Sequence, residues 1–237
     1  MKCGPRDSKN LVRGVVKFTL TACLGILLIS HAAYSVPTPT DPQKEIKKLL
    51  RQAKERLRGG QLTESEALLR KASGIDPTRS DVKVELAYVL TKQRRIVEAY
   101  EMVFEVAKAQ PTNTRALAVF GATMLAGGRF REARLLFAQA IRLNRREHLA
   151  WAGYGMVDFY ENQIGEGIAN LREAVYHEPD EPDYIFALAQ VSARAELFGE
   201  AAEAYRTFLK ISKVSDLDRR ARIRGLIDFL LYLSRSD

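Results

Sequence analysis

Apolar residues recur at spacings of three and four along most of the chain, which is the pattern of helices that bury one face. The alternation typical of strands is absent, so we expect an all-α protein. The pattern itself returns every 34 residues, with apolar positions at Ala72, Val106, Ala140, Ala174 and Phe208, and at Leu62, Ile96, Phe130, Ile164 and Phe198. Five copies of a two-helix repeat over 45–215 therefore predict a stacked array.

Each repeat has a small residue at one fixed position in either helix. In the first helix these residues are Ala53, Ala87, Gly121, Gly155 and Ala189, and in the second they are Ser65, Ala99, Ala133, Gly167 and Ala201. Large residues stand beside them, at Leu69, Val103, Phe137, Leu171 and Tyr205. Small positions next to large ones predict antiparallel helices that approach each other closely.

These residues resemble the tetratricopeptide repeat (TPR) family. Trp151, Tyr154 and Gly155 are similar to its first-helix residues, and its second-helix signature is matched by Gly128, Phe130, Ala133, Phe137 and Ala140. Arg145 and Lys213 depart from it, because proline is usual there. The resemblance implies a right-handed superhelical solenoid of antiparallel helix pairs, which binds a partner in a concave groove and performs no chemistry.

The first 35 residues have the three-part pattern of a secretory signal peptide: a basic segment over 1–17, an apolar one over 18–30, and small residues before a cleavage point after Ser35. The alternative is an uncleaved membrane anchor, because about 22 mostly apolar residues from Val15 to Val36 could span a bilayer. Both interpretations place the repeats outside the cytoplasm. The protein would be periplasmic or secreted after cleavage, or anchored to the membrane.

The segments on either side of the repeats have their own patterns. A proline-rich linker is expected over 36–44, and a C-terminal capping helix over 216–237 with Ser215 as its N-cap. Phe229 and Leu231 widen the apolar face of this last helix beyond what a cap needs. Self-association or docking through the last helix is therefore a second expected mode of contact.

The formal net charge of +8 first suggests an acidic partner such as nucleic acid. The first 35 residues contain five basic residues and one acidic one, so they hold +4 of this charge and the rest of the chain holds the other +4. Such a mild excess is typical of a solvated helical surface. We expect no nucleic-acid binding, and membrane contact only through an uncleaved N-terminal segment.

No arrangement of residues predicts catalysis, a cofactor or a metal site. His148 and His177 lack the paired spacing of metal ligands. The acidic cluster over 178–183 contains two prolines, and this combination commonly begins a helix, so we interpret it as helix punctuation. The protein is predicted not to be an enzyme.

The resemblance places the groove on first-helix residues that point away from their partner helix. Carried over to this chain, the predicted peptide-binding residues are Lys54, Tyr88, Lys92, Arg115, Ala122, Met156, Phe159, Tyr160, Phe186, Gln190 and Arg194. Small residues at Ala118, Ala122, Ala126, Ala152 and Gly153 would let a partner backbone come close. The other interpretation is that Tyr88, Phe159 and Phe186 only pack against neighbouring repeats.

The apolar middle and basic ends of this groove favour a peptide with apolar anchors and acidic flanks. The predicted function is thus a non-enzymatic adaptor or scaffold outside the cytoplasm, which binds a protein or peptide in the groove. The alternative is a regulatory or substrate-positioning subunit of an envelope enzyme or of a secretion or assembly complex.

Overall fold

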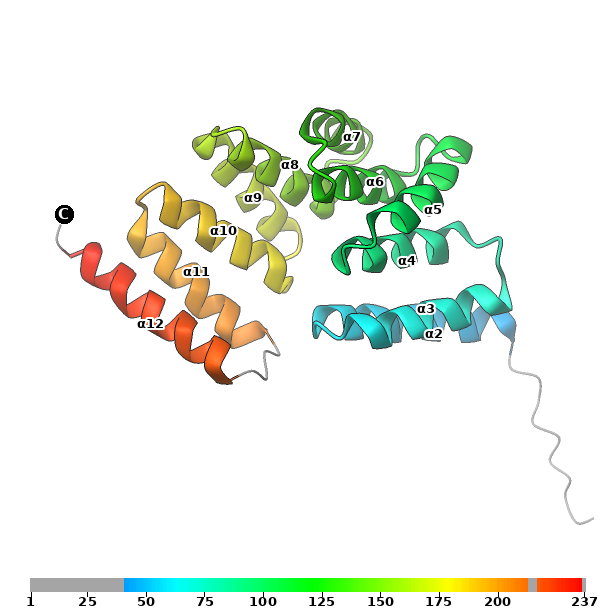
Figure 1. Ribbon diagram of the computed structural model, residues 1–237, viewed down its shortest axis with the longest axis horizontal. Coiled ribbons are helices and arrows are strands. Elements are labelled where there is room, and N and C mark those ends of the chain that lie inside the picture. Colours follow the sequence, from blue (N-terminus) through cyan, green and yellow to red (C-terminus); the bar gives the residue numbers. More distant parts are fainter. Residues whose placement is uncertain (1–40, 213–216, 236–237) are drawn as a thin grey trace, which may run out of the picture. The chain divides into compact units, whose positions relative to one another are not determined.

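The computed structural model describes residues 41–212 and 217–235, and these ranges contain helices and loops but no strand (Figure 1). The described helices are α2 (Pro42–Arg58), α3 (Leu62–Ile75), α4 (Ser80–Lys92), α5 (Ile96–Ala109), α6 (Thr114–Ala126), α7 (Phe130–Leu143), α8 (His148–Tyr160), α9 (Ile164–His177), α10 (Pro182–Arg194), α11 (Phe198–Ile211) and α12 (Leu217–Leu233). The all-α prediction is confirmed. The expected leader over 1–35 and the N-cap at Ser215 lie outside the described residues.

The helices pack in the order of the sequence. The repeats are the pairs α2–α3, α4–α5, α6–α7, α8–α9 and α10–α11, and α12 packs against α11. Short turns make the two helices of a pair antiparallel neighbours. The expected solenoid of helix pairs is thereby confirmed. Among the helices that the structure describes, none is long and apolar enough to cross a membrane.

The close helix crossings occur where small residues were expected. All fifteen predicted packing positions, small and large, are buried. A Cβ atom added at Gly155 would lie 2.8 Å from the carbonyl oxygen of Gly167, so the two helix backbones of this repeat touch directly. At Gly121 the same atom would lie 2.7 Å from the ring of Phe137.

Two of the small residues expected to admit a partner backbone are in contact with the core. A Cβ atom at Gly153 would lie only 2.1 Å from the ring of Phe137, because this ring occupies the space above the glycine. Ala118 is fully buried. Ala118 is therefore closed to a partner, whereas Gly153 still borders the pocket described below.

The turn inside each repeat ends the first helix in the same way. One residue per turn has a positive φ, between 63° and 76°, and these residues are Gly60, Arg94, Gly128, Asn162 and Glu196. In each case the next amide donates a hydrogen bond to a carbonyl five residues earlier, for example Arg95 to Leu90. This is the Schellman arrangement, which satisfies the free carbonyls at a helix end.

The first helix begins earlier than the sequence predicted. It starts at Pro42, within the segment expected to be a linker. Proline is favoured in the first turn of a helix, because its fixed φ suits the helix and its missing amide is not needed there. The last helix, α12, runs over Leu217–Leu233, close to its expected bounds.

Candidate functional site

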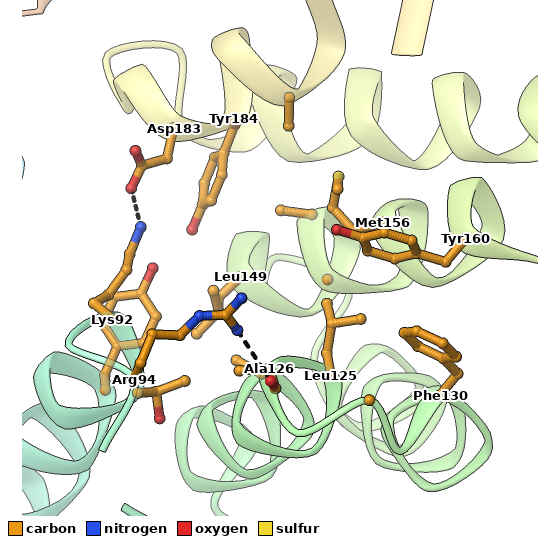
Figure 2. Close-up of a pocket in the computed structure, with 17 residues that line it drawn as sticks. Lys92, Arg94, Leu125, Ala126, Phe130, Leu149, Met156, Tyr160, Asp183 and Tyr184 are labelled. Carbon is orange, nitrogen blue, oxygen red and sulfur yellow. Dashed lines mark hydrogen bonds and ion pairs between the residues drawn. The ribbon is translucent and has the colours of Figure 1, made fainter. Parts of the chain in front are cut away.

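A pocket of about 550 Å³ lies among the first helices of four successive repeats, α4, α6, α8 and α10 (Figure 2). We call this the central pocket. Its wall is largely apolar and includes Leu125, Leu149, Met156 and Tyr160. The 34-residue period brings these side chains together, because it places equivalent faces of the first helices next to one another.

Tyr160 is the most accessible aromatic residue of this wall. Its ring stacks on that of Phe130, with the ring centroids 5.2 Å apart and the planes 19° from parallel. The side chain nevertheless remains 56% exposed. In Figure 2 Tyr160 and Met156 lie side by side in the pocket wall. Together they offer an incoming side chain an apolar contact surface.

Polar groups at another part of the pocket are bound to each other. The ammonium group of Lys92 forms an ion pair with Asp183, and Arg94 Nη1 donates a hydrogen bond to the carbonyl oxygen of Ala126 at 3.0 Å (Figure 2). Nζ of Lys92 also lies 5.7 Å from the ring centroid of Tyr88. The Lys92 charge is thus already compensated by the protein itself.

A second cavity of about 280 Å³ shares Tyr88 and Tyr184 with the central pocket, and we call it the charged cleft. The carboxylate of Glu85, whose side chain is only 8% exposed, accepts two hydrogen bonds from Arg115, at 3.2 and 3.1 Å. Lys54 lies 3.4 Å from the same carboxylate. Although burial opposes it, the charges of Arg115 and Lys54 lower the pKa of Glu85.

The charged cleft also links the first repeat to the fifth. Arg58 contacts Glu178 and Glu181 in and beside the loop before α10. Burial, with the negative charge of Asp183, raises the pKa of Glu181. The result is a dense set of opposite charges along the cleft.

His148 lies in the same cleft. Its Nδ1 lies 2.8 Å from the hydroxyl oxygen of Tyr184. Burial, together with the charge of Arg115, lowers the pKa of this histidine, so its neutral form is favoured. Among the described residues, no three His, Cys, Asp or Glu side chains come together as a metal site would need.

The predicted peptide-binding residues fall into three groups. Tyr88, Lys92, Ala122, Met156 and Tyr160 line the central pocket, while Lys54, Arg115 and again Tyr88 line the charged cleft. Phe159, Phe186, Gln190 and Arg194 line neither. The structure thus brings together the middle of the predicted groove and not its C-terminal end.

Phe186 and Phe159 take part in packing instead. The ring of Phe186 lies 5.0 Å from that of Phe208 and 5.6 Å from that of Tyr205, so it faces the second helix of its own repeat. Phe159 is half-buried against the main hydrophobic core. For these two residues the packing interpretation describes their surroundings. Gln190 and Arg194 are exposed on α10.

Sequence reasoning missed the role of the acidic cluster before α10. Pro182 does begin that helix, as helix punctuation would require. Glu178 and Asp183, however, also pair with Arg58 and Lys92, which precede them by 120 and 91 residues. Apart from the charges themselves, the sequence holds no signal for these ion pairs. The stacking of the intervening helices brings the two residues of each pair together.

Two sequence-family models, both of the tetratricopeptide repeat, match this chain. They match residues 56–119 and 155–214, which together are just over half of it. Anaphase-promoting complex subunit 3 of Schizosaccharomyces pombe is 24% identical over 142 residues, which are 60% of this chain and 21% of that protein. The match therefore spans about a fifth of the length of this curated relative.

Solved structures of similar fold include a thermophilic TPR protein from Thermus thermophilus, with a TM-score of 0.64 and 21% identity. That match covers 77% of this chain and 98% of the other. PilF of Pseudomonas aeruginosa has a TM-score of 0.52 and 18% identity, over 82% of this chain and 92% of the other. At these identities the two likenesses show the fold.

Proposed function

Because the chain belongs to the tetratricopeptide repeat family, whose fold supports protein–protein interaction scaffolds, we propose that it is an adaptor that holds a partner's peptide segment in the central pocket. The observation that carries this proposal is the wall formed by Met156 and Tyr160, where an aromatic side chain is more than half exposed inside a hollow. A concave apolar surface with a few polar groups at its edge is typical of a binding site.

The size and chemistry of the pocket favour an apolar anchor. A volume of about 550 Å³ admits one or two large side chains of a partner. Acidic flanks, which the sequence favoured, have less support, because Lys92, Arg115 and Lys54 already contact Asp183 and Glu85. A partner carboxylate would have to displace one of these acids, so we propose apolar residues with neutral polar flanks.

The proposal also places the repeats outside the cytoplasm. Its support is the sequence pattern of residues 1–35, which lie outside the described residues. N-terminal sequencing of the protein purified from its native cell tests the cleavage. A mature chain that starts at Val36 would support export with cleavage, while an intact Met1 in a membrane fraction would support the anchor. An intact chain in the cytoplasmic fraction would contradict both.

Cross-linking and capture from native cells test the pocket itself. The full chain should capture a partner, and the double variant Met156→Ala/Tyr160→Ala should capture it at least about tenfold less, because the two contacts that are lost are central to the site. The matched control is Leu135→Ala/Tyr176→Ala, which removes two side chains that are 70% and 80% exposed outside the pocket.

Circular dichroism must show equal helicity in all three proteins. Equal capture by the pocket variant and the unmodified chain would refute the pocket as the binding site. A partner that is captured only as part of an assembled enzyme, and not as an isolated peptide, would favour the alternative of a subunit in an envelope complex.

A further inference from the structure

Another cavity of about 550 Å³ lies between α7, α8 and α9, and it shares no lining residue with the central pocket or the charged cleft. We call it the tryptophan cavity. Its lining includes Ile141, Arg142, Arg145, Trp151, Tyr154 and Asn170. It therefore combines an apolar floor with two aromatic rings and two cations.

The two aromatic rings are held in place by their neighbours. Nε1 of Trp151 donates a hydrogen bond to the carbonyl oxygen of Arg145 at 2.8 Å, which fixes the indole and leaves its apolar surface to the cavity. The guanidinium of Arg134 lies 5.0 Å from the ring centroid of Tyr154 and is itself paired with Asp158 at 2.8 Å. A rigid aromatic wall lowers the entropy cost of binding.

The cations of this cavity differ from those of the charged cleft. Arg142 and Arg145 are exposed, and within the part of the chain that the structure describes their guanidinium groups form no ion pair and no hydrogen bond. In the charged cleft, by contrast, Arg58 and Arg115 are each paired with two carboxylates. Two uncompensated positive charges thus lie beside the tryptophan.

We propose that the tryptophan cavity is a second binding site, which takes an acidic peptide segment with one large apolar side chain. The apolar side chain enters between Ile141 and Trp151, and flanking carboxylates pair with Arg142 and Arg145. Guanidinium groups bind carboxylates with two parallel hydrogen bonds, so two free arginines at the rim select for acidic residues.

A peptide fits these observations better than nucleic acid or a lipid surface. Binding to a phosphate backbone uses many cations along a track, whereas here two arginines flank a hollow that admits a few side chains. The site is independent of the proposed function of the central pocket. An adaptor with both sites could hold an apolar segment and an acidic segment at once.

The chain contains a single tryptophan, so indole emission, excited at a wavelength that tyrosine does not absorb, reports on this cavity. The full chain is titrated with the peptide acetyl-Asp-Glu-Leu-Phe-Glu-Asp-amide. We expect a saturable change in emission, whose midpoint rises with salt because the charges are exposed. The variant Arg142→Glu/Arg145→Glu should bind at least about tenfold more weakly, since attraction becomes repulsion.

The matched control is Arg51→Glu/Arg224→Glu, which makes the same change in net charge at exposed residues outside the cavity. It should bind like the unmodified chain. If charge reversal lowers helicity, Arg142→Gln/Arg145→Gln replaces it and should weaken binding in the same direction.

Four results would overturn the proposal. The first is no saturable change in emission up to about 1 mM peptide, which is the limit of weak specific binding. The second is that the cavity variant binds the acidic peptide as tightly as the unmodified chain does, and the third is that the unmodified chain binds a peptide with Lys and Arg in place of the acids equally tightly. The fourth is a response to phosphatidylglycerol vesicles or duplex DNA without a response to the acidic peptide.

Discussion

Nη2 of Arg58, at the end of α2, lies 2.5 Å from Oε1 of Glu178, which follows it by 120 residues. Nε of the same guanidinium lies 3.6 Å from Glu181. This arginine therefore links the first repeat to the start of the fifth, beside the charged cleft. Both partners of the pair belong to loops or helix ends, where the chain opens most readily.

Replacing Arg58 with alanine should loosen this link. Because the Arg58 side chain is 52% exposed, the loss in the free energy of unfolding should stay below about 1 kcal/mol. Hydrogen exchange should nevertheless become faster over 178–183, since Glu178 and Glu181 then repel each other. Arg56→Ala, which breaks an exposed pair with Glu64 inside the first repeat, serves as the control. Unchanged exchange over 178–183 would refute the link.

The turn inside the fifth repeat places Glu196 at φ 63°, where Gly60 and Gly128 occupy the equivalent positions of two other repeats. Glu196→Gly should therefore raise the free energy of unfolding by about 0.5–1 kcal/mol, because glycine adopts this conformation without steric cost. Urea denaturation measures the change. Glu203→Gly, within α11, should instead lower stability by about 1 kcal/mol. A loss of stability in Glu196→Gly would contradict the expectation.

Gly155 and Gly167 form the tightest backbone crossing described above. Gly155→Ala should cost about 1–3 kcal/mol, because the added Cβ atom would lie 2.8 Å from a backbone oxygen that has little room to move. Gly165→Ala is the matched control: nothing lies within 4 Å of its added Cβ atom, so helix propensity alone should leave stability unchanged or higher. Equal midpoints of urea denaturation for the two variants would contradict this account.

Glu66 provides a dependence of stability on pH. Although burial opposes it, hydrogen bonds from Gln93, Arg95 and Arg70 lower the pKa of Glu66 from 4.5 to about 2. A pKa that is lower in the folded state means that this carboxylate stabilises the fold above about pH 4.5, and that its contribution is lost as the pH falls towards 2. Glu66→Gln should therefore lower stability by about 1 kcal/mol at pH 7.

The difference between this variant and the unmodified chain should shrink between pH 4.5 and 2. Urea denaturation over this pH range measures it. The control is Glu101→Gln on α5, because Glu101 is exposed and has no ion pair or hydrogen bond of its side chain among the described residues. If the stability difference between Glu66→Gln and the unmodified chain does not change with pH, the variant has lost packing or hydrogen bonds and not the interaction of a charge.

The helix pairs could be predicted from the sequence because the forces that form them act over short distances. Phe137 and Gly155 lie within one or two helices of the residues that they contact, and the equivalent small and large positions are buried in every repeat. A pattern of small, large and apolar residues therefore specifies each crossing. The middle of the central pocket was expected from the family resemblance, and Tyr88, Ala122 and Met156 occupy equivalent faces of α4, α6 and α8.

Only the tertiary structure decided which of these surfaces remain open. Phe186 and Tyr160 are both aromatic residues of first helices, yet Tyr205 and Phe208 cover the first while the second stays exposed. The pairing of Arg58 with Glu178 depends on how small rotations between successive helices add up across the whole array. No single repeat encodes that sum, so the closed charges of the cleft emerge only when the repeats are stacked.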